Sequence, residues 1–342
     1  MNVRRTRGAV VVAVLSMLAV AGGASPAAAQ AAEDTVAPVV TVESAPPAAT
    51  RDDTATVTFS ATDPERPDAV LTFRCLRHSP LLRSEGPCSS PWTAGSLVEG
   101  QHSLRIAATD EAGNESMAVW VHWHRDLTAP AVWWTHLERF TTAPGAEFRW
   151  GGQDVSGVGS YDVRYRVARY DGTFGAYRYR DSAQGTTATS FTIALRRGYT
   201  YCVSFRARDD LGNLGAWQSG QCTAAPLDDA LLTPSAGWTR HTSANFYGGT
   251  YTFARTPGRT LTLRGIAGRG VGLVARTCPG CGKVRVLVNG EVGTEISTNA
   301  AKTTYRKMWG ISWSYLRTDA TITLVTMDSK PVYIDGLAVL RA

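Results

Sequence analysis

The residue types best suited to bind a ligand lie close together near the end of the chain. Trp309 and Trp313 stand four residues apart in a run rich in Gly and Ser, and Tyr305 and Arg306 come just before them. Aromatic rings pack well against the apolar faces of sugars, and the basic residue stands beside them. We therefore predict a ligand site at Tyr305, Arg306, Trp309 and Trp313. The alternative is that these rings fill the core of a domain.

Six cysteines supply a second kind of chemistry, the disulfide bond. Their spacing predicts three local bridges: Cys75 with Cys88, Cys202 with Cys222, and Cys278 with Cys281. Positions 202 and 222 centre on Gly212, which lies in an expected turn, so these two side chains should face each other across a hairpin. Cys278 and Cys281 could instead form half of a zinc site, but no second pair of ligands exists in this part of the chain.

Sequence patterns typical of catalysis are missing. We find no Gly-x-Ser-x-Gly elbow, no His-Glu-x-x-His pair and no phosphate-binding Gly loop, and the paired cysteines leave no free thiol. His122 and His124 share one face of an expected strand, but no third metal ligand is identifiable, so we expect both to be solvated. We therefore expect no enzyme activity, no cofactor and no bound metal ion. A carboxylate pair that acts on glycans is the alternative.

Aspartates recur in the expected turns, at Asp63, Asp110, Asp209 and Asp210. An Asp side chain can hydrogen-bond the backbone of its own turn, and this local role explains such positions without a ligand. Carboxylate oxygens are also the ligands that Ca²⁺ prefers, so calcium between domains is the alternative. We expect the local role.

The N-terminal residues predict export. Three arginines precede an apolar run over residues 8–24, and the small residues Ala27 and Ala29 form a cleavage site. The run is short for a membrane span and is followed by a cleavage pattern, so a retained membrane anchor is the weaker alternative. We expect a secreted, extracellular protein that has lost residues 1–29 and has no membrane contact.

The net charge of +6 is unevenly distributed. Residues 33–125 carry 7 basic and 13 acidic side chains, residues 126–225 carry 11 and 9, and residues 226–342 carry 14 and 7. A basic extracellular module favours anionic polymers such as wall polysaccharides, although dispersed charge also serves solubility. Export and disulfides argue against a nucleic-acid partner.

The elements that position these residues are expected to be strands. Alternating runs of Val, Thr, Tyr and Phe, bounded by Gly, Pro, Asn and Asp, recur along the chain, for example at 56–60, 161–166 and 283–288. No segment shows the apolar period of a helix. About 310 residues remain after cleavage, which is too many for one sandwich. The sequence therefore predicts an all-β fold of three tandem β-sandwich domains.

Two motifs recur about one hundred residues apart and place the first domain boundary. Residues 34–40 return as 126–132, and residues 107–114 return as 206–213, each ending in Gly-Asn. That period suits whole domains in tandem. We predict domains at 30–125, 126–225 and 226–342. Each Asp-x-x-Gly-Asn segment is expected to form a hairpin turn in which Gly and Asn supply positive φ.

The second domain, residues 127–225, resembles a fibronectin type III module. Trp150 stands where that family places a core Trp, residues 161–166 look like its strand C, and Leu195 and Tyr201 reproduce its Leu-x5-Tyr spacing. The chain departs from the family in having a disulfide, and in carrying Arg where the usual residue is Pro, two positions after Leu195.

The first domain, residues 34–125, resembles the bacterial Ig-like domains of secreted and surface proteins. The segments that match, in order, are 73–76, 88–91, 100–110 and the Gly-Asn pair at 113–114. This resemblance implies a spacer or adhesion module.

The third domain, residues 226–342, looks like a jelly-roll sandwich of the carbohydrate-binding-module type. The likeness lies in a Gly-Trp pair at 237–238, a strand-like run with an Asn-Gly turn over 284–290, and a closing run at 332–336. The whole resembles secreted multidomain proteins of the actinobacterial type. The resemblance implies a non-catalytic binding or adhesion protein whose last domain binds extracellular carbohydrate or another cell-surface polymer, with surface proteins as further partners. A purely structural spacer or protein-adhesion array, and an unrecognised glycan-active enzyme, are the alternatives.

Overall fold

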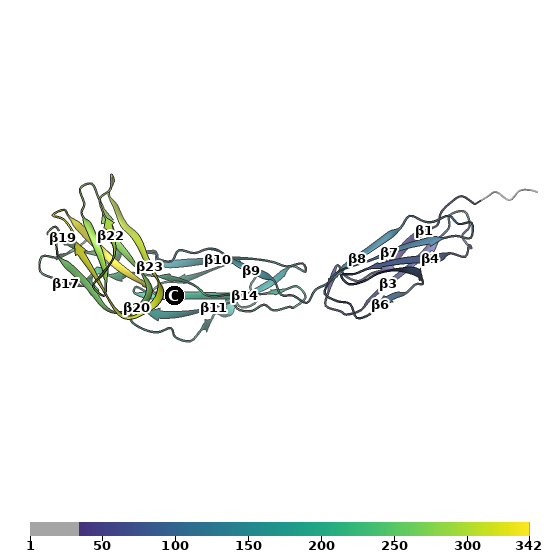
Figure 1. Ribbon diagram of the computed structural model, residues 1–342, viewed down its shortest axis with the longest axis horizontal. Helices are drawn as coiled ribbons and strands as arrows, with labels where there is room; N and C mark the ends of the chain where they lie inside the picture. Colours follow the sequence, from purple (N-terminus) through teal and green to yellow (C-terminus); the bar gives the residue numbers. More distant parts are fainter. Residues whose placement is uncertain (1–33, 342) are drawn as a thin grey trace, which may run out of the picture.

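The computed structural model describes residues 34–341, so the predicted signal peptide lies outside the described residues. Regular structure in this range is β-strand, apart from short 3-10 turns at Asp181–Ala183, Asp229–Leu231 and Tyr247–Gly249. The strands form three β domains that follow one another along the chain (Figure 1). This architecture confirms the predicted all-β fold class. No helix within the described range is long and apolar enough to cross a membrane.

The first domain contains two sheets that pack face to face. Its three-stranded sheet has the order β1 (Val39–Ser44), β3 (Ala55–Thr62) and β6 (Trp92–Ala94). Its five-stranded sheet has the order β2 (Ala49–Thr50), β8 (Val119–Arg125), β7 (Gly100–Thr109), β4 (Thr72–His78) and β5 (Arg83–Cys88). Alternate residues of each strand point inward, so Val57 and Phe59 of β3 join Leu104 and Ile106 of β7 in one buried cluster.

Strand β8 shows the alternation that the sequence predicts. Val121 and Trp123 are buried, whereas His122 is exposed and stacks on the exposed ring of Trp120 with centroids 5.8 Å apart. The expectation of a solvated side chain is confirmed for His122, and His124 is half-buried near the end of the strand.

The second domain also contains two sheets. One has the order β13 (Ser190–Ala194), β10 (Gly145–Gln153) and β9 (Ala131–His136), and the other has the order β12 (Arg178–Tyr179), β11 (Val158–Arg169), β14 (Tyr199–Asp209) and β15 (Gln221–Ala224). Trp150 is buried and stacks on Phe205 with centroids 5.0 Å apart. Tyr201 is buried too, and its hydroxyl accepts a hydrogen bond of 3.0 Å from the backbone N–H of Arg196. Trp150 and Tyr201, which the sequence singles out, therefore both lie in the core.

The three predicted disulfides are present: Cys75–Cys88, Cys202–Cys222 and Cys278–Cys281. Cys202 and Cys222 stand directly opposite each other on β14 and β15, as the count about Gly212 predicts.

The Asp-x-x-Gly-Asn turns differ from the expectation in one respect. Gly113 and Gly212 have positive φ values of 95° and 93°, but the asparagines that follow them do not. The side chains of Asn114 and Asn213 instead donate hydrogen bonds to the aspartate that opens each turn. Asn is therefore used here for its side-chain amide and not for its tolerance of positive φ.

The third domain is built around two long strands that belong to both of its layers. Strands β20 (Thr260–Thr277) and β23 (Thr304–Thr326) pair along most of their length, with register shifts between Leu263 and Gly270. Gly265 has a φ of 70° in this stretch, a conformation that favours glycine and allows the strand to bend. All strands of this domain consequently form one nine-stranded sheet that folds over a single core.

The shorter strands extend the two ends of the long pair. One layer continues through β24 (Val332–Leu340), β19 (Thr250–Ala254) and β18 (Thr239–Thr242), with β16 (Leu227–Asp228) beside β24. The other layer continues through β21 (Lys283–Val288) and β22 (Glu291–Ser297), with β17 (Thr233–Pro234) beside β20. Asn289 and Gly290 join β21 to β22 with φ values of 51° and 86°, which confirms the predicted hairpin turn.

The second and third domains share a buried contact. Leu340 of β24 packs in one cluster with the Cys202–Cys222 disulfide. Phe140 of the second domain lies against Gly272 of β20, where an added Cβ would come within 2.9 Å of the ring. The first domain, by contrast, joins the second through a narrow connection (Figure 1).

Candidate functional site

Four ring-bearing side chains line up across one outer surface of the third domain. His241 on β18 lies opposite Tyr251 on β19, and Phe253 on β19 lies opposite Tyr333 on β24. The ring centroids are 5.1 Å apart in the first pair and 5.0 Å apart in the second. We call His241, Tyr251, Phe253 and Tyr333 the aromatic face.

The aromatic face points away from the core because the residues between its members point into the core. Thr252 and Ile334 are fully buried. His241 is exposed, and the other three rings of the face are half-buried. The water-facing side of an antiparallel sheet is normally polar. A row of partly exposed rings on that side is therefore a candidate surface for a ligand.

Arg276 of β20 closes one end of the aromatic face. Its guanidinium carbon lies 4.5 Å from the ring centroid of Tyr333 and 5.4 Å from that of Tyr305. A guanidinium over an aromatic ring is held by the negative charge on the ring face. The face therefore ends beside a fixed positive charge.

Arg306 holds the loop that precedes β19. Its guanidinium donates hydrogen bonds of 3.1 to 3.2 Å to the backbone carbonyls of residues 244–246. The ring of Phe246 in this loop stacks on Tyr251 at 4.2 Å and meets the ring of Tyr305 edge-on at 5.1 Å. Tyr305 and Arg306, both predicted from the sequence, therefore adjoin the aromatic face.

A hollow of about 370 Å³ lies beside the same loop, between the second and third domains. Leu195 and Arg197 line it from the second domain, and Phe246, Tyr247 and Arg306 line it from the third. The guanidinium of Arg197 pairs with Asp228, its Nη1 lying 3.4 Å from Oδ2. That of Arg306 bonds the backbone carbonyls described above and keeps a charge that suits an anionic group, because arginine pairs well with carboxylate and phosphate.

The two predicted tryptophans lie on the other side of the sheet. Trp309 and Trp313 are half-buried and pack, together with Ile311, against the core of the third domain. The indole N–H of Trp313 donates a hydrogen bond of 2.9 Å to the carbonyl of Gly268. Along this part of β23 the side chains alternate, so these residues share the inner side. Arg306 has a φ of 54°, which interrupts the alternation, so Tyr305 faces the other way and contacts Arg276. The structure thus separates Trp309 and Trp313 from Tyr305 and Arg306.

The sequence carries only a weak signal for the aromatic face. Tyr251-Thr252-Phe253 and the run around Tyr333 both alternate large and small or apolar side chains, as a half-buried strand does. Nothing in this alternation shows that β19 and β24, which are far apart in the sequence, are neighbours.

Two carboxyl groups lie in the interior of the third domain. Asp335 accepts a hydrogen bond of 2.6 Å from the backbone N–H of Tyr247, and Asp229 accepts bonds of 2.7 and 2.5 Å from the hydroxyls of Thr250 and Thr252. Burial raises the pKa of Asp335 to about 7 and also raises the pKa of Asp229. Both residues are 0% exposed, so neither carboxyl group reaches a surface on which a polymer could lie.

Comparisons with known proteins give likenesses among solved structures. No protein-family model matches the sequence, and a comparison with curated proteins gave no match. The chain is similar to the CBM36-1 domain of a multidomain xylanase from the hindgut metagenome of Trinervitermes trinervoides, at 14% identity and a TM-score of 0.28, over 35% of this chain and 98% of that one. It is also similar to a carbohydrate-binding module CBM36 in complex with calcium and xylotriose, at 10% identity and a TM-score of 0.26, over 33% of this chain and 97% of that one.

A third likeness is to part of an enzyme. The catalytic unit of a thermostable GH87 alpha-1,3-glucanase from Streptomyces thermodiastaticus strain HF3-3 is similar at 16% identity and a TM-score of 0.28, over 34% of this chain and 26% of that one. The chain thus spans about a quarter of the length of that catalytic unit.

Proposed function

We propose that the chain is a secreted, non-catalytic binding protein whose third domain binds an extracellular carbohydrate or another wall polymer. The observation that carries this proposal is the aromatic face, a row of rings on the outer side of the β18–β19–β24 layer. Flat rings pack against the apolar C–H faces of sugar units, while the Tyr hydroxyls and the His ring offer hydrogen bonds to sugar hydroxyls. A linear polymer can lie along such a row without a deep cleft.

The charge of the third domain favours an anionic polymer. Residues 226–342 carry 14 basic and 7 acidic side chains, a net charge of +7. Arg276 stands at one end of the aromatic face, and Arg306 lines the adjacent hollow with Arg197. A chain that crosses the face could place an acidic substituent in this hollow, where guanidinium groups pair with carboxylate or phosphate.

Two further observations support the secreted and non-catalytic parts of the proposal. Each domain carries one disulfide, which persists in an oxidising compartment. The buried carboxyl groups of Asp229 and Asp335 are inaccessible, whereas a pair that hydrolyses glycosidic bonds must flank its substrate.

Co-sedimentation of residues 30–342 with insoluble polysaccharides and purified bacterial cell walls tests the proposal. The informative variant is Tyr251→Leu with Tyr333→Leu, because leucine keeps an apolar side chain on the strand and removes the ring. We expect binding to the preferred polymer to weaken at least tenfold, a loss of about 1.4 kcal/mol or more. Thermal unfolding of the variant shows whether the domain remains folded.

Two other variants provide the controls. Tyr315→Leu changes a 55% exposed tyrosine of β23 that lies outside the aromatic face, and it should leave binding unchanged. Trp309→Ala with Trp313→Ala tests the site expected from the sequence, and we expect it to lower stability more than affinity. Absence of binding to every polymer, or an equal loss in Tyr315→Leu, would contradict the proposal.

A further inference from the structure

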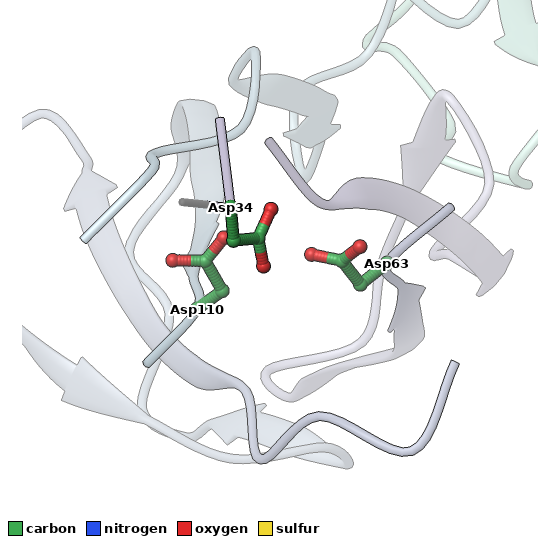
Figure 2. Close-up of side chains that lie close together, drawn as sticks. All are labelled: Asp34, Asp63 and Asp110. Atoms are coloured by element: carbon green, nitrogen blue, oxygen red, sulfur yellow. The ribbon is translucent and has the colours of Figure 1, made fainter. Parts of the chain in front are cut away.

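Three aspartates converge at one end of the first domain, and three converge at the matching end of the second. In each set, one carboxylate oxygen from each residue lies within 4.8 Å of the others: Asp34, Asp63 and Asp110 in the first domain, and Asp126, Asp154 and Asp209 in the second. Figure 2 shows the first set, with the carboxylate of Asp63 turned toward Asp34 and Asp110. We call these sets the first and second aspartate clusters.

The two clusters are built in the same way. Each combines an aspartate from the opening segment of its domain with two aspartates at strand ends. Asn114 donates hydrogen bonds of 2.8 and 2.9 Å to the carboxylate of Asp110 and one of 3.0 Å to the backbone carbonyl of Asp34. Asn213 makes the equivalent three bonds in the second cluster, at 2.7, 2.7 and 3.2 Å.

These hydrogen bonds leave one buried carboxylate oxygen without a partner in each cluster. Asp63 is 2% exposed, and its Oδ2 has no hydrogen-bond partner within residues 34–341. Asp126 is 0% exposed, and its Oδ2 is also unpartnered there. The local role expected from the sequence accounts only for the other oxygen, which accepts bonds from Glu65 and Arg66 in the case of Asp63. Burying a carboxylate oxygen without a partner costs free energy, so the unpartnered oxygens of Asp63 and Asp126 both favour a bound cation.

The clusters differ in the positive charge that the chain supplies. Arg66 lies beside the first cluster, with its Nε 3.3 Å from Oδ2 of Asp34. In the part of the chain that the structure describes, no ion pair involves Asp126, Asp154 or Asp209. The second cluster therefore gathers three carboxylates without a protein cation.

We propose that each aspartate cluster binds one divalent cation, and that the ion is calcium. All the converging atoms are carboxylate oxygens, which Ca²⁺ prefers, whereas Zn²⁺ prefers nitrogen and sulfur. Calcium holds oxygen ligands at about 2.3 to 2.6 Å, so opposed ligands lie about 5 Å apart. Magnesium holds them at about 2.0 to 2.1 Å and demands near-ideal octahedral geometry, which three protein-anchored carboxylates meet less readily.

The second site lies at the junction between the first two domains. The backbone N–H of Asp126 donates a hydrogen bond of 2.9 Å to the carbonyl of Thr50 in the first domain. The backbone carbonyl of Asp126 accepts the bond from Asn213 in the second domain. An ion held by the Asp126 carboxylate therefore fixes the residue through which the two domains meet. This inference replaces the expectation from the sequence that the chain binds no metal.

Calcium binding by the mature chain tests the proposal directly. Protein freed of metal with EDTA is titrated with CaCl₂ in a calorimeter, and thermal unfolding is followed with and without calcium. We expect calcium to raise the midpoint of unfolding of the wild type. Asp63→Asn and Asp126→Asn should each reduce the number of bound ions by one. In both variants the amide nitrogen replaces the unpartnered oxygen, while the other oxygen keeps its hydrogen bonds.

The metal-free proteins provide a readout that a folding defect would not imitate. Each Asp→Asn variant removes one of three crowded negative charges, so without calcium it should unfold at the same temperature as the wild type or higher. Calcium should raise the unfolding temperature of the variant by less than it raises that of the wild type. Glu111→Gln, an exposed change beside Asp110, is the matched control and should retain every bound ion.

Four results would overturn the inference or a part of it. A wild type that neither binds calcium nor is stabilised by it would overturn both sites, and this measurement needs no variant. Variants that retain the full number of ions would overturn the assignment of residues. Equal binding of magnesium would overturn the choice of ion. Solution scattering tests the role at the junction: calcium should narrow the range of domain orientations in the wild type and in Asp63→Asn, but not in Asp126→Asn. If calcium leaves the scattering of the wild type unchanged, that role is overturned.

Discussion

The hydroxyl of Thr200 in the second domain donates a hydrogen bond of 2.8 Å to the backbone carbonyl of Val339 in the third. The same hydroxyl accepts a bond of 3.1 Å from the backbone N–H of Arg341. Thr200 is 0% exposed, so this pair of bonds is made out of contact with water. One small side chain therefore makes hydrogen bonds to two backbone groups of the neighbouring domain. The contact between these domains thus includes specific hydrogen bonds as well as apolar packing.

Replacing Thr200 with valine should loosen that contact. The change keeps the size and shape of the side chain and leaves two buried backbone groups with fewer partners. We expect a loss of about 1–3 kcal/mol in the free energy of unfolding. Urea unfolding measures the loss, and Thr200→Ser, which retains the hydroxyl, should recover most of it. A valine variant as stable as the wild type would show that the interface does not depend on this bond.

The contribution of each disulfide to stability should increase with the length of the loop that it closes. Cys202 and Cys222 are separated by 20 residues, and Cys278 and Cys281 by 3. Loop-closure entropy predicts a loss of about 3 kcal/mol for the Cys202→Ala/Cys222→Ala variant and about 2 kcal/mol for the Cys278→Ala/Cys281→Ala variant. Denaturant unfolding of the two double variants gives the comparison. The reverse order would mean that packing around the sulfurs, and not the unfolded chain, determines these energies.

Stability of the third domain should fall as the pH rises from about 4 to about 7. Burial raises the pKa of Asp335 to about 7 in the folded protein, whereas an unfolded Asp titrates near about 3.9. Between these values the unfolded chain releases a proton that the folded chain keeps, so rising pH favours unfolding. Asp335→Asn, which can still accept the bond from Tyr247, should have a flatter profile and be more stable at pH 8. Parallel profiles for both proteins would refute this.

Arginines and aromatic rings alternate on the outer surface of the second domain and should stabilise it. Trp217 lies under the guanidinium groups of Arg164 and Arg206, at 4.1 and 4.7 Å from its ring centroid. At about 0.5–1 kcal/mol for each contact, Trp217→Ala should lose about 1–2 kcal/mol. Trp217→Phe, which keeps an aromatic face, should lose less. Chemical denaturation measures the series, and equal losses for both substitutions would argue against a role for the ring.

Features of this fold that depend on neighbours in the sequence could be predicted from it. The pairing of Cys202 with Cys222 follows from a count about one turn, and the burial of Trp123 follows from alternation along one strand. Alternation also places Trp309 and Trp313 on one side of their strand, because they are an even number of residues apart. It does not say which side, and in the structure that side is the inner one.

The sites themselves depend on contacts between distant segments. The aspartates of each cluster come from three places in the sequence, and only the packing of two sheets brings their carboxylates together. The sequence repeat contains two of the three positions in each domain, but it predicts a turn only at Asp110 and Asp209 and does not predict that the carboxylates meet. The aromatic face likewise requires that β24 lie beside β19, which no local pattern indicates.

The position of β24 also limits when the third domain can become complete. This strand lies between β19 and β20 in the middle of its layer, although it follows every other strand of the domain in the chain. Until residue 340 has emerged, β19 and β20 have no common neighbour and the layer that bears the aromatic face cannot close. A protein delivered across a membrane from its N-terminus would thus have its first two domains formed while the third was still an open chain. The polymer-binding surface that we propose would arise only after translocation, on the far side of the membrane.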